Sequence, residues 1–105
     1  MKTSELTGAA LDWAVTKCEG FDHEVTSSEW GMWGWATDWS QGGPIIEREG
    51  FCIQPFSGGW ECFVAHRLFE DDHHHSKGPT PLIAAMRCYV ASVMGDNIDI
   101  PEELK

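Results

Sequence analysis

The segment from Thr80 to Gly95 constrains the fold more than any other part of the chain. Thr80 followed by Pro81 is typical of a helix start, because threonine caps the first turn and proline has no amide hydrogen to leave unpaired there. Gly95 is typical of a helix end. Apolar residues recur between them at helical spacing: Leu82, Met86, Tyr89, Val90 and Val93. The segment predicts a helix with Met86 and Val90 buried, and with Arg87 off the stripe and free to reach a ligand.

Two other segments carry helix signals. Residues 8–19 predict a helix that Thr7 caps and Gly20 ends, with an apolar side formed by Leu11, Ala14, Val15 and Cys18. Residues 44–49 predict one or two helical turns, because Pro44 suits the first position and Gly50 follows the end.

The strand signals are shorter. Residues 51–56 and 60–68 predict a hairpin, since a Ser-Gly-Gly turn joins two runs rich in aromatic and apolar residues. Residues 70–78 predict a polar loop, 97–101 a short edge strand, and 21–43 a long loop that holds four of the six tryptophans. The 105 residues suit one domain over 1–105. We therefore expect an α+β fold, with two helices packed on a small antiparallel β-sheet and a long Trp-rich loop.

The charge balance restricts the partners. Seventeen acidic residues against seven basic ones give a formal net charge of −10, which repels nucleic acid and anionic membranes. We expect neither as a partner. The same charge is expected to keep the protein soluble. Alternatively, it forms an acidic surface that mimics DNA and blocks a host enzyme. No apolar run is long enough to span a bilayer and the first residues do not form a signal peptide, so we expect a cytoplasmic protein with reduced cysteines.

No catalytic pattern stands out. His73, His74 and His75 are consecutive, and consecutive side chains of a loop point in different directions, so we expect a solvated loop rather than a metal site. Phosphate-binding loops and a nucleophile elbow are absent from the sequence. We expect no enzyme activity, no catalytic residue, no metal and no cofactor.

The stretch from Asp38 to Glu49 (DWSQGGPIIERE) is the main candidate for a binding site. Two glycines before Pro44 would leave a helix start bare of side chains, so that backbone amides could meet an anionic ligand. A neighbouring ring could stack on a base, and a guanidinium could bind a phosphate. The alternative is a structural turn in which Trp39 fills the core. The candidate ligand-binding residues are Trp39, Gln41, Gly42, Gly43, Ile45 and Arg48, with Thr80 at the other helix start.

Three blocks resemble one known family. They are KTSELTGAALDWAV (2–15), DWSQGGPIIERE (38–49) and GPTPLIAAMRCYVASVMGD (78–96), and together they resemble the NinX-like family of small proteins from bacterial phages and prophages. The resemblance implies a phage accessory protein that acts in the cytoplasm of the infected host, and it implies no catalytic residue. It also directs attention to the two blocks that contain helix starts, which could form opposite walls of one pocket.

Phage accessory proteins of this size often counter host defence, and three mechanisms are open. The first, which the tryptophans and the glycine turn favour, is a sponge that binds and sequesters a nucleotide-type host signal. The second, which the charge favours, is an acidic inhibitor of a host protein. The third, a metal-dependent nucleotide hydrolase, depends on the histidine loop alone. A homo-oligomer is compatible with each of them.

Overall fold

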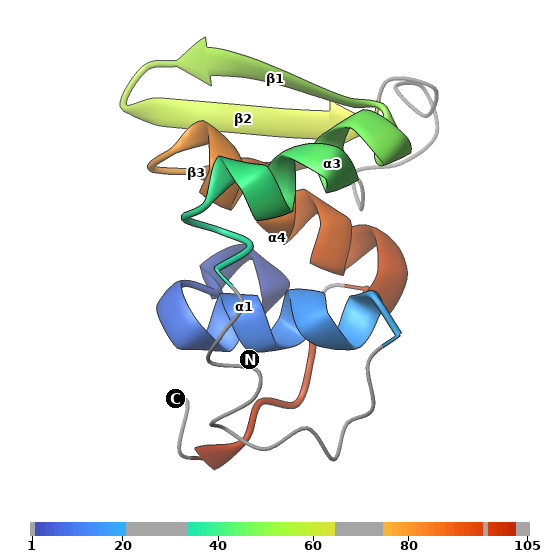
Figure 1. Ribbon diagram of the computed structural model, residues 1–105. Coiled ribbons are helices and arrows are strands. Elements are labelled where there is room, and N and C mark those ends of the chain that lie inside the picture. Colours follow the sequence, from blue (N-terminus) through green and yellow to red (C-terminus); the bar gives the residue numbers. More distant parts are fainter. Residues whose placement is uncertain (1, 21–33, 65–74, 96, 103–105) are drawn as a thin grey trace.

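The computed structural model describes residues 2–20, 34–64, 75–95 and 97–102 (Figure 1). Its elements combine helices with an antiparallel sheet, so the predicted α+β class is confirmed. In chain order they are the 3-10 helix η1 (Thr3–Glu5), α1 (Gly8–Cys18), α3 (Trp39–Glu49), β1 (Phe51–Phe56), β2 (Gly59–Val64), β3 (His75–Gly78) and α4 (Pro81–Met94).

Helix α4 forms where the sequence predicts it. The Thr80 hydroxyl accepts a hydrogen bond from the amide of Ile83 (3.1 Å), and Gly95 ends the helix with a φ of 85°. Met86 and Val90 are fully buried, as predicted. Val93, the last residue of the predicted apolar stripe, lies in the last turn and is 50% exposed. Other sides of α4 are buried as well, at Ala84, Ala85, Cys88 and Ala91.

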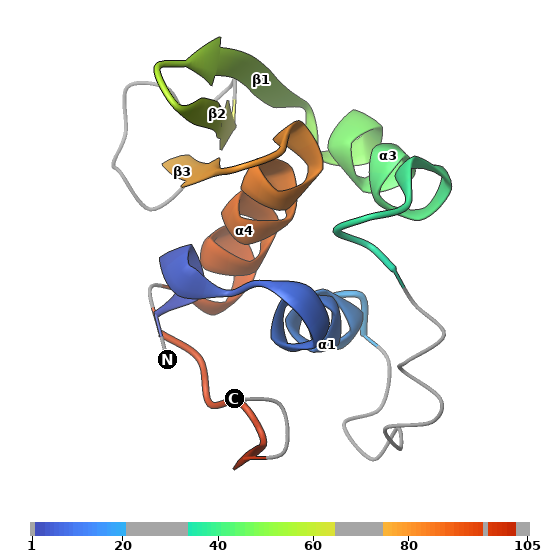
Figure 2. The ribbon, with the colours of Figure 1, turned by 90° about the vertical axis from the view of Figure 1, so that its left-hand side faces the viewer.

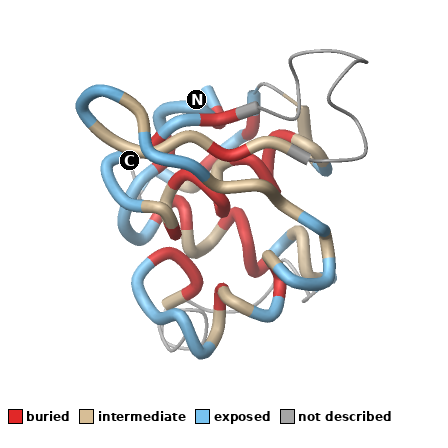
Figure 3. The backbone as a smooth tube through the Cα atoms, turned by 90° about the horizontal axis from the view of Figure 1, so that it is seen from above, coloured by how far each residue is buried: buried red, intermediate tan, exposed pale blue. Residues whose placement is uncertain are grey.

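This extra burial follows from the layer order. The sheet covers one side of α4, and α1 packs on the side away from the sheet (Figure 1). The expectation that both helices pack on the sheet is therefore wrong for α1, which packs on α4 instead. Helix α3 and strand β3 lie on opposite flanks of α4 (Figure 2). Seen from above, the buried residues gather towards the centre and exposed residues lie around them (Figure 3). None of the described helices is long and apolar enough to cross a membrane.

The sheet has the order β1-β2-β3, and both pairings are antiparallel. Cys62 pairs with Ser76, and both are buried, whereas the neighbouring pair of Glu61 and Lys77 belongs to the other face of the sheet. Residues 75–78 therefore form a strand and not the predicted loop. Their sequence, His-Ser-Lys-Gly, has no residue that favours strands. Pairing with β2 and packing against α4 stabilise the strand instead.

Helix α3 also differs from the prediction. It begins at Trp39, where the Asp38 carboxylate accepts a hydrogen bond from the amide of Ser40 (2.9 Å), and Pro44 lies inside it. The predicted start at Pro44 is wrong, and residues 39–43, which were expected to belong to a loop, are part of the helix.

The described residues after α4, 95 and 97–102, do not add an edge strand to the sheet. Asn97 makes one isolated antiparallel bridge with Lys2, and Ile98 and Ile100 are buried in the core. The segment 97–101 was predicted to be a strand because apolar residues alternate in it. The alternation is real, but its apolar side packs in the core rather than on the sheet.

Candidate functional site

Helix α3 carries six of the seven residues expected to bind a ligand, but it does not bring its ring and its cation together. Trp39 and Arg48 are nine residues apart in one helix. That separation places them about 13.5 Å apart along the axis and half a turn apart around it. One small molecule cannot stack on the first and bind the second without bridging the helix.

The two glycines of α3 have different surroundings. A Cβ at Gly42 would lie 2.3 Å from the Trp35 carbonyl oxygen and 2.7 Å from Leu82 Cδ1, so Gly42 lets the helix pack closely against its neighbours. A Cβ at Gly43 would meet only Trp39 Cε3, at 3.9 Å. The block around Gly42 and the start of α4 are therefore in direct contact at Leu82, where a shared pocket between them was expected.

The backbone amides expected to bind an anion are also not at a helix start. Ile45 and Ile46 are the seventh and eighth residues of α3, and only the first four amides of a helix lack an acceptor within it. The Ile45 side chain is 1% exposed and packs in the core. The proposed anion site at these amides was inferred from a start at Pro44, and it is wrong for that reason.

Gln41 and Thr80 use their polar groups within the chain. The Gln41 Oε1 atom accepts a hydrogen bond from the amide of Gly34 (2.6 Å), which fixes the segment before α3. The Thr80 hydroxyl caps α4. Ligand contacts at both residues stay predictions.

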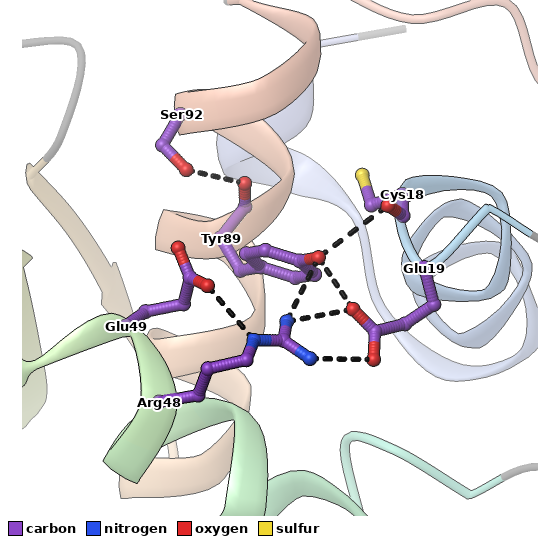
Figure 4. Close-up of polar contacts among 6 residues, drawn as sticks. All are labelled: Cys18, Glu19, Arg48, Glu49, Tyr89 and Ser92. Atoms are coloured by element: carbon purple, nitrogen blue, oxygen red, sulfur yellow. Dashed lines mark hydrogen bonds and ion pairs between the residues drawn. The ribbon is translucent and has the colours of Figure 1, made fainter.

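The side chain of Arg48, in α3, connects three helices through hydrogen bonds (Figure 4). Its Nη1 and Nη2 atoms donate to the two carboxylate oxygens of Glu19 at the end of α1 (3.0 and 2.7 Å), and Nη2 also donates to the Tyr89 hydroxyl of α4 (3.1 Å). Its Nε atom donates to Glu49 (2.9 Å). The Arg48 hydrogen bonds hold the pKa of Glu19 below its usual value, and burial raises the pKa of Tyr89. Two carboxylates already compensate this cation.

Among the described tryptophans Trp35, and not Trp39, is buried in the core. Trp35 is 6% exposed and its indole N–H donates to the Thr16 hydroxyl (2.9 Å), whereas Trp39 is 53% exposed. The next amide, of Ala36, donates to Asp12 Oδ1 (3.1 Å). Burial raises the pKa of Asp12. The alternative in which Trp39 fills the core is therefore wrong, and the Trp39 ring is accessible for contacts.

A second location, on the other flank of α4, combines a hollow with positive charge. An open pocket of about 460 Å³ lies beside β3, and we call it the β3 pocket. The residues that matter for its chemistry are Ser4, Phe56, Gly58, Lys77, Gly78 and Arg87. They come from η1, β1, the β1–β2 turn, β3 and α4.

Close packing fixes this corner of the fold. A Cβ at Gly78 would lie 2.8 Å from the Ala84 amide nitrogen, so the end of β3 lies directly on the first turn of α4. Likewise a Cβ at Gly59 would lie 2.7 Å from the Gly78 carbonyl oxygen. The strand that carries Lys77 is thereby held against the helix that carries Arg87.

Arg87 and Lys77 are the cations of the β3 pocket. Arg87 donates from Nε to the Leu6 carbonyl (2.7 Å) and from Nη1 to the Lys77 carbonyl (2.9 Å), and burial lowers its pKa. The Lys77 ammonium lies 5.2 Å from the centre of the Phe56 ring. Within the described ranges neither has a carboxylate at ion-pair distance, in contrast to Arg48. The predicted position of Arg87 off the apolar stripe is confirmed, although two of its donors are used by backbone carbonyls.

Sequence reasoning identified Arg87 here but missed Lys77 and Phe56. The missing signal is the strand at 75–78, because only its pairing with β2 places Lys77 beside the helix. No group of three metal-ligating side chains occurs among the residues that the structure describes. The metal-dependent alternative depends on His73, His74 and His75. The first two lie outside those residues, as do Trp30 and Trp33, and His75 is the first residue of β3.

Comparison with known proteins identifies the family. No curated protein matches the chain. The family model described as "Bacteriophage P22, NinX" matches residues 2–93, which include α1, α3, the sheet and nearly all of α4. The resemblance read from the three sequence blocks is thus confirmed over most of the chain, and the chain belongs to the NinX family of phage proteins.

Proposed function

We propose that this phage protein acts against host defence by binding and sequestering a small nucleotide-type molecule in the β3 pocket. The observation that carries the proposal is the presence of two cations, Lys77 and Arg87, at one open pocket of a chain with a net charge of −10. Elsewhere the described arginine, Arg48, is compensated by Glu19 and Glu49. Among the described residues neither Lys77 nor Arg87 has a carboxylate at ion-pair distance, although Glu61 is the cross-strand partner of Lys77. Cations without an ion-pair partner are typical of a site for an anion.

Electrostatics support binding despite the acidic chain. Arg87 is partly desolvated, and its described partners are neutral carbonyl oxygens. A charge in such surroundings interacts more strongly with an anion than a fully hydrated charge does. The repulsion from distant carboxylates is screened over about 8 Å at physiological ionic strength. Lys77 and Arg87 are therefore the charges of the described lining that a small ligand meets first.

The other lining groups suit the uncharged part of a nucleotide. Phe56 contributes an aromatic ring for contact with a base, and Ser4 contributes a hydroxyl. Gly58, with a φ of 92° and no atom within 4 Å of an added Cβ, leaves the rim open. An aromatic ring together with cations is the combination that binds a base and a phosphate.

Thermal unfolding with a panel of nucleotides and cyclic nucleotide signals tests the proposal. A ligand at 100 times its Kd should stabilise the protein by about 2.7 kcal/mol. The ligand should be recovered chemically intact after release from the protein. A recovered product would instead identify an enzyme.

Lys77→Ala and Lys17→Ala form a matched pair for locating the site. Both lysines are exposed, and each ammonium lies over an aromatic ring. The distance to the ring centre is 5.2 Å for Lys77 over Phe56 and 5.0 Å for Lys17 over Trp13. Each substitution changes the net charge equally. Lys77→Ala should weaken binding about tenfold, as expected for loss of one charged hydrogen bond, and Lys17→Ala should not. Equal effects would place the ligand elsewhere.

Exposed Trp39 favours a second candidate function, binding of a host protein. Trp39 is 53% exposed in the first turn of α3, beside the carboxylate of Asp38. Tryptophan is enriched among residues that dominate protein interfaces. Under this function, Trp39→Ala should abolish co-purification of a specific host protein while Lys77→Ala preserves it. Retention of the same partner by Trp39→Ala would refute a role for this surface.

A further inference from the structure

We infer that the β3 pocket selects a terminal phosphate monoester over a phosphodiester. This inference rests on the proposed function and specifies the phosphate group of its ligand. It divides nucleotide-type molecules into two classes, because nucleoside monophosphates end in a monoester and cyclic nucleotides contain only diesters. Three features of the pocket support the monoester.

The first feature is the number of charges. Lys77 and Arg87 are the charged residues among the described residues that line the pocket, and this part of the lining carries two positive charges and no negative one. A phosphate monoester carries a charge of about −1.5 to −2 at pH 7, and a diester carries −1. A monoester therefore matches both cations, whereas a diester leaves one of them uncompensated.

The second feature is the number of hydrogen-bond donors. A guanidinium has five N–H groups, and Arg87 uses one at Nε and one at Nη1 for the carbonyls of Leu6 and Lys77. No acceptor for the other three occurs in the part of the chain that the structure describes. The Lys77 ammonium adds three donors. A monoester offers three terminal oxygens to these donors, whereas a diester offers two and blocks the others with carbon.

The third feature is the attachment of Arg87. Bonds to two backbone carbonyls, one before α1 and one in β3, fix its guanidinium between two elements. A fixed fork loses less conformational entropy when it binds a phosphate than a mobile side chain does. Burial also disfavours the charge of Arg87, and a dianion relieves that cost more fully than a monoanion.

Calorimetric titration with three probes tests the inference: adenosine 5′-monophosphate, adenosine 3′,5′-cyclic monophosphate and inorganic phosphate. The first two share base and sugar, so a difference between them isolates the phosphate. We expect the monophosphate to bind at least about tenfold more tightly at pH 7.5. Its affinity should fall as the pH drops below about 6, where the monoester gains a proton, and the affinity of the cyclic nucleotide should not.

The Lys77→Ala variant, with Lys17→Ala as its control, completes the test. Loss of one of two cations should reduce the preference for the monophosphate, and Lys17→Ala should retain it. Equal or tighter binding of the cyclic nucleotide would overturn this inference and leave the proposed function standing. If none of the three probes binds, this inference falls, and the wider nucleotide panel decides the proposed function. If inorganic phosphate binds as tightly as the monophosphate, the monoester preference stands and the nucleotide part of the proposed function falls.

Discussion

Two adjacent glycines of α3 should respond in opposite ways to the same added methyl group. Alanine at Gly42 would place its Cβ 2.3 Å from the Trp35 carbonyl oxygen and 2.7 Å from Leu82 Cδ1. Alanine at Gly43 would meet nothing closer than Trp39 Cε3, at 3.9 Å. Both positions lie inside the helix, and neither has a positive φ.

The expected free energies follow from these distances. Replacement of glycine by alanine inside a helix contributes about 1 kcal/mol of stability, because alanine loses less backbone entropy on folding. Gly43→Ala should show this gain. Overpacking costs about 1–3 kcal/mol, and Gly42→Ala should reach the upper end because one clash is with backbone. The net loss at Gly42 is then about 2 kcal/mol, and the two variants differ by about 3 kcal/mol.

Urea unfolding followed by tryptophan fluorescence measures the difference, since the indole of Trp35 is buried in the folded protein. The slope of the free energy against urea should be the same for both variants. Equal stabilities would refute the close packing of α3 on α4. Gly42 would then be free for the ligand contact that its place in the sequence first indicated.

Three further substitutions test the core and its polar ties. Met86→Ala should cost roughly 2–5 kcal/mol in urea unfolding, because Met86 is fully buried, and a loss below 1 kcal/mol would contradict its position. Glu19 has a lowered pKa, so its contribution to stability is present above its unfolded value of 4.5 and is lost as the pH falls through the folded pKa. Glu19→Gln should therefore lower the free energy of unfolding by about 1–3 kcal/mol at pH 7. This free energy should also fall less steeply in acid than that of the parent, and an unchanged dependence on pH would count against the ion pair with Arg48. Burial raises the pKa of Asp12 in the folded protein, so the free energy of unfolding falls as the pH rises through this raised pKa and the carboxyl group ionises. Asp12→Asn retains an oxygen for the amide of Ala36 and should be at least as stable as the parent at pH 7, whereas a clear loss would show that the carboxylate is needed.

The parts of the fold that local signals specify were predictable from the sequence. Thr80 and Gly95 mark the start and the end of α4, and both could be recognised because capping depends on a few neighbouring residues. Strand β3 was not predictable, because its stability comes from pairing with β2 and from Gly78 packing on α4. The same limit applies to α3, where Gly42 serves a contact with Leu82 that lies forty residues along the chain.

The candidate site was predictable only in part. Helical spacing placed Arg87 off the apolar stripe of α4, and the structure confirms that position. Lys77 joins it because residues distant in sequence meet at one corner, which no local pattern reports. The glycines before Pro44 indicated a helix start, whereas Asp38 supplies the cap several residues earlier. The site expected on α3 was thus inferred from a helix boundary that the chain does not use.

Amide chemical shifts test most directly whether a phosphate ligand binds in the β3 pocket, as proposed. Titration of isotope-labelled protein with adenosine 5′-monophosphate should shift the amides of Gly58, Lys77 and Gly78 most, together with the side-chain Nε–H of Arg87. The amides of Gly42 and Gly43 and the indole N–H of Trp39, on the opposite flank of α4, should change little. Saturable shifts confined to α3, with none at β3, would contradict the account.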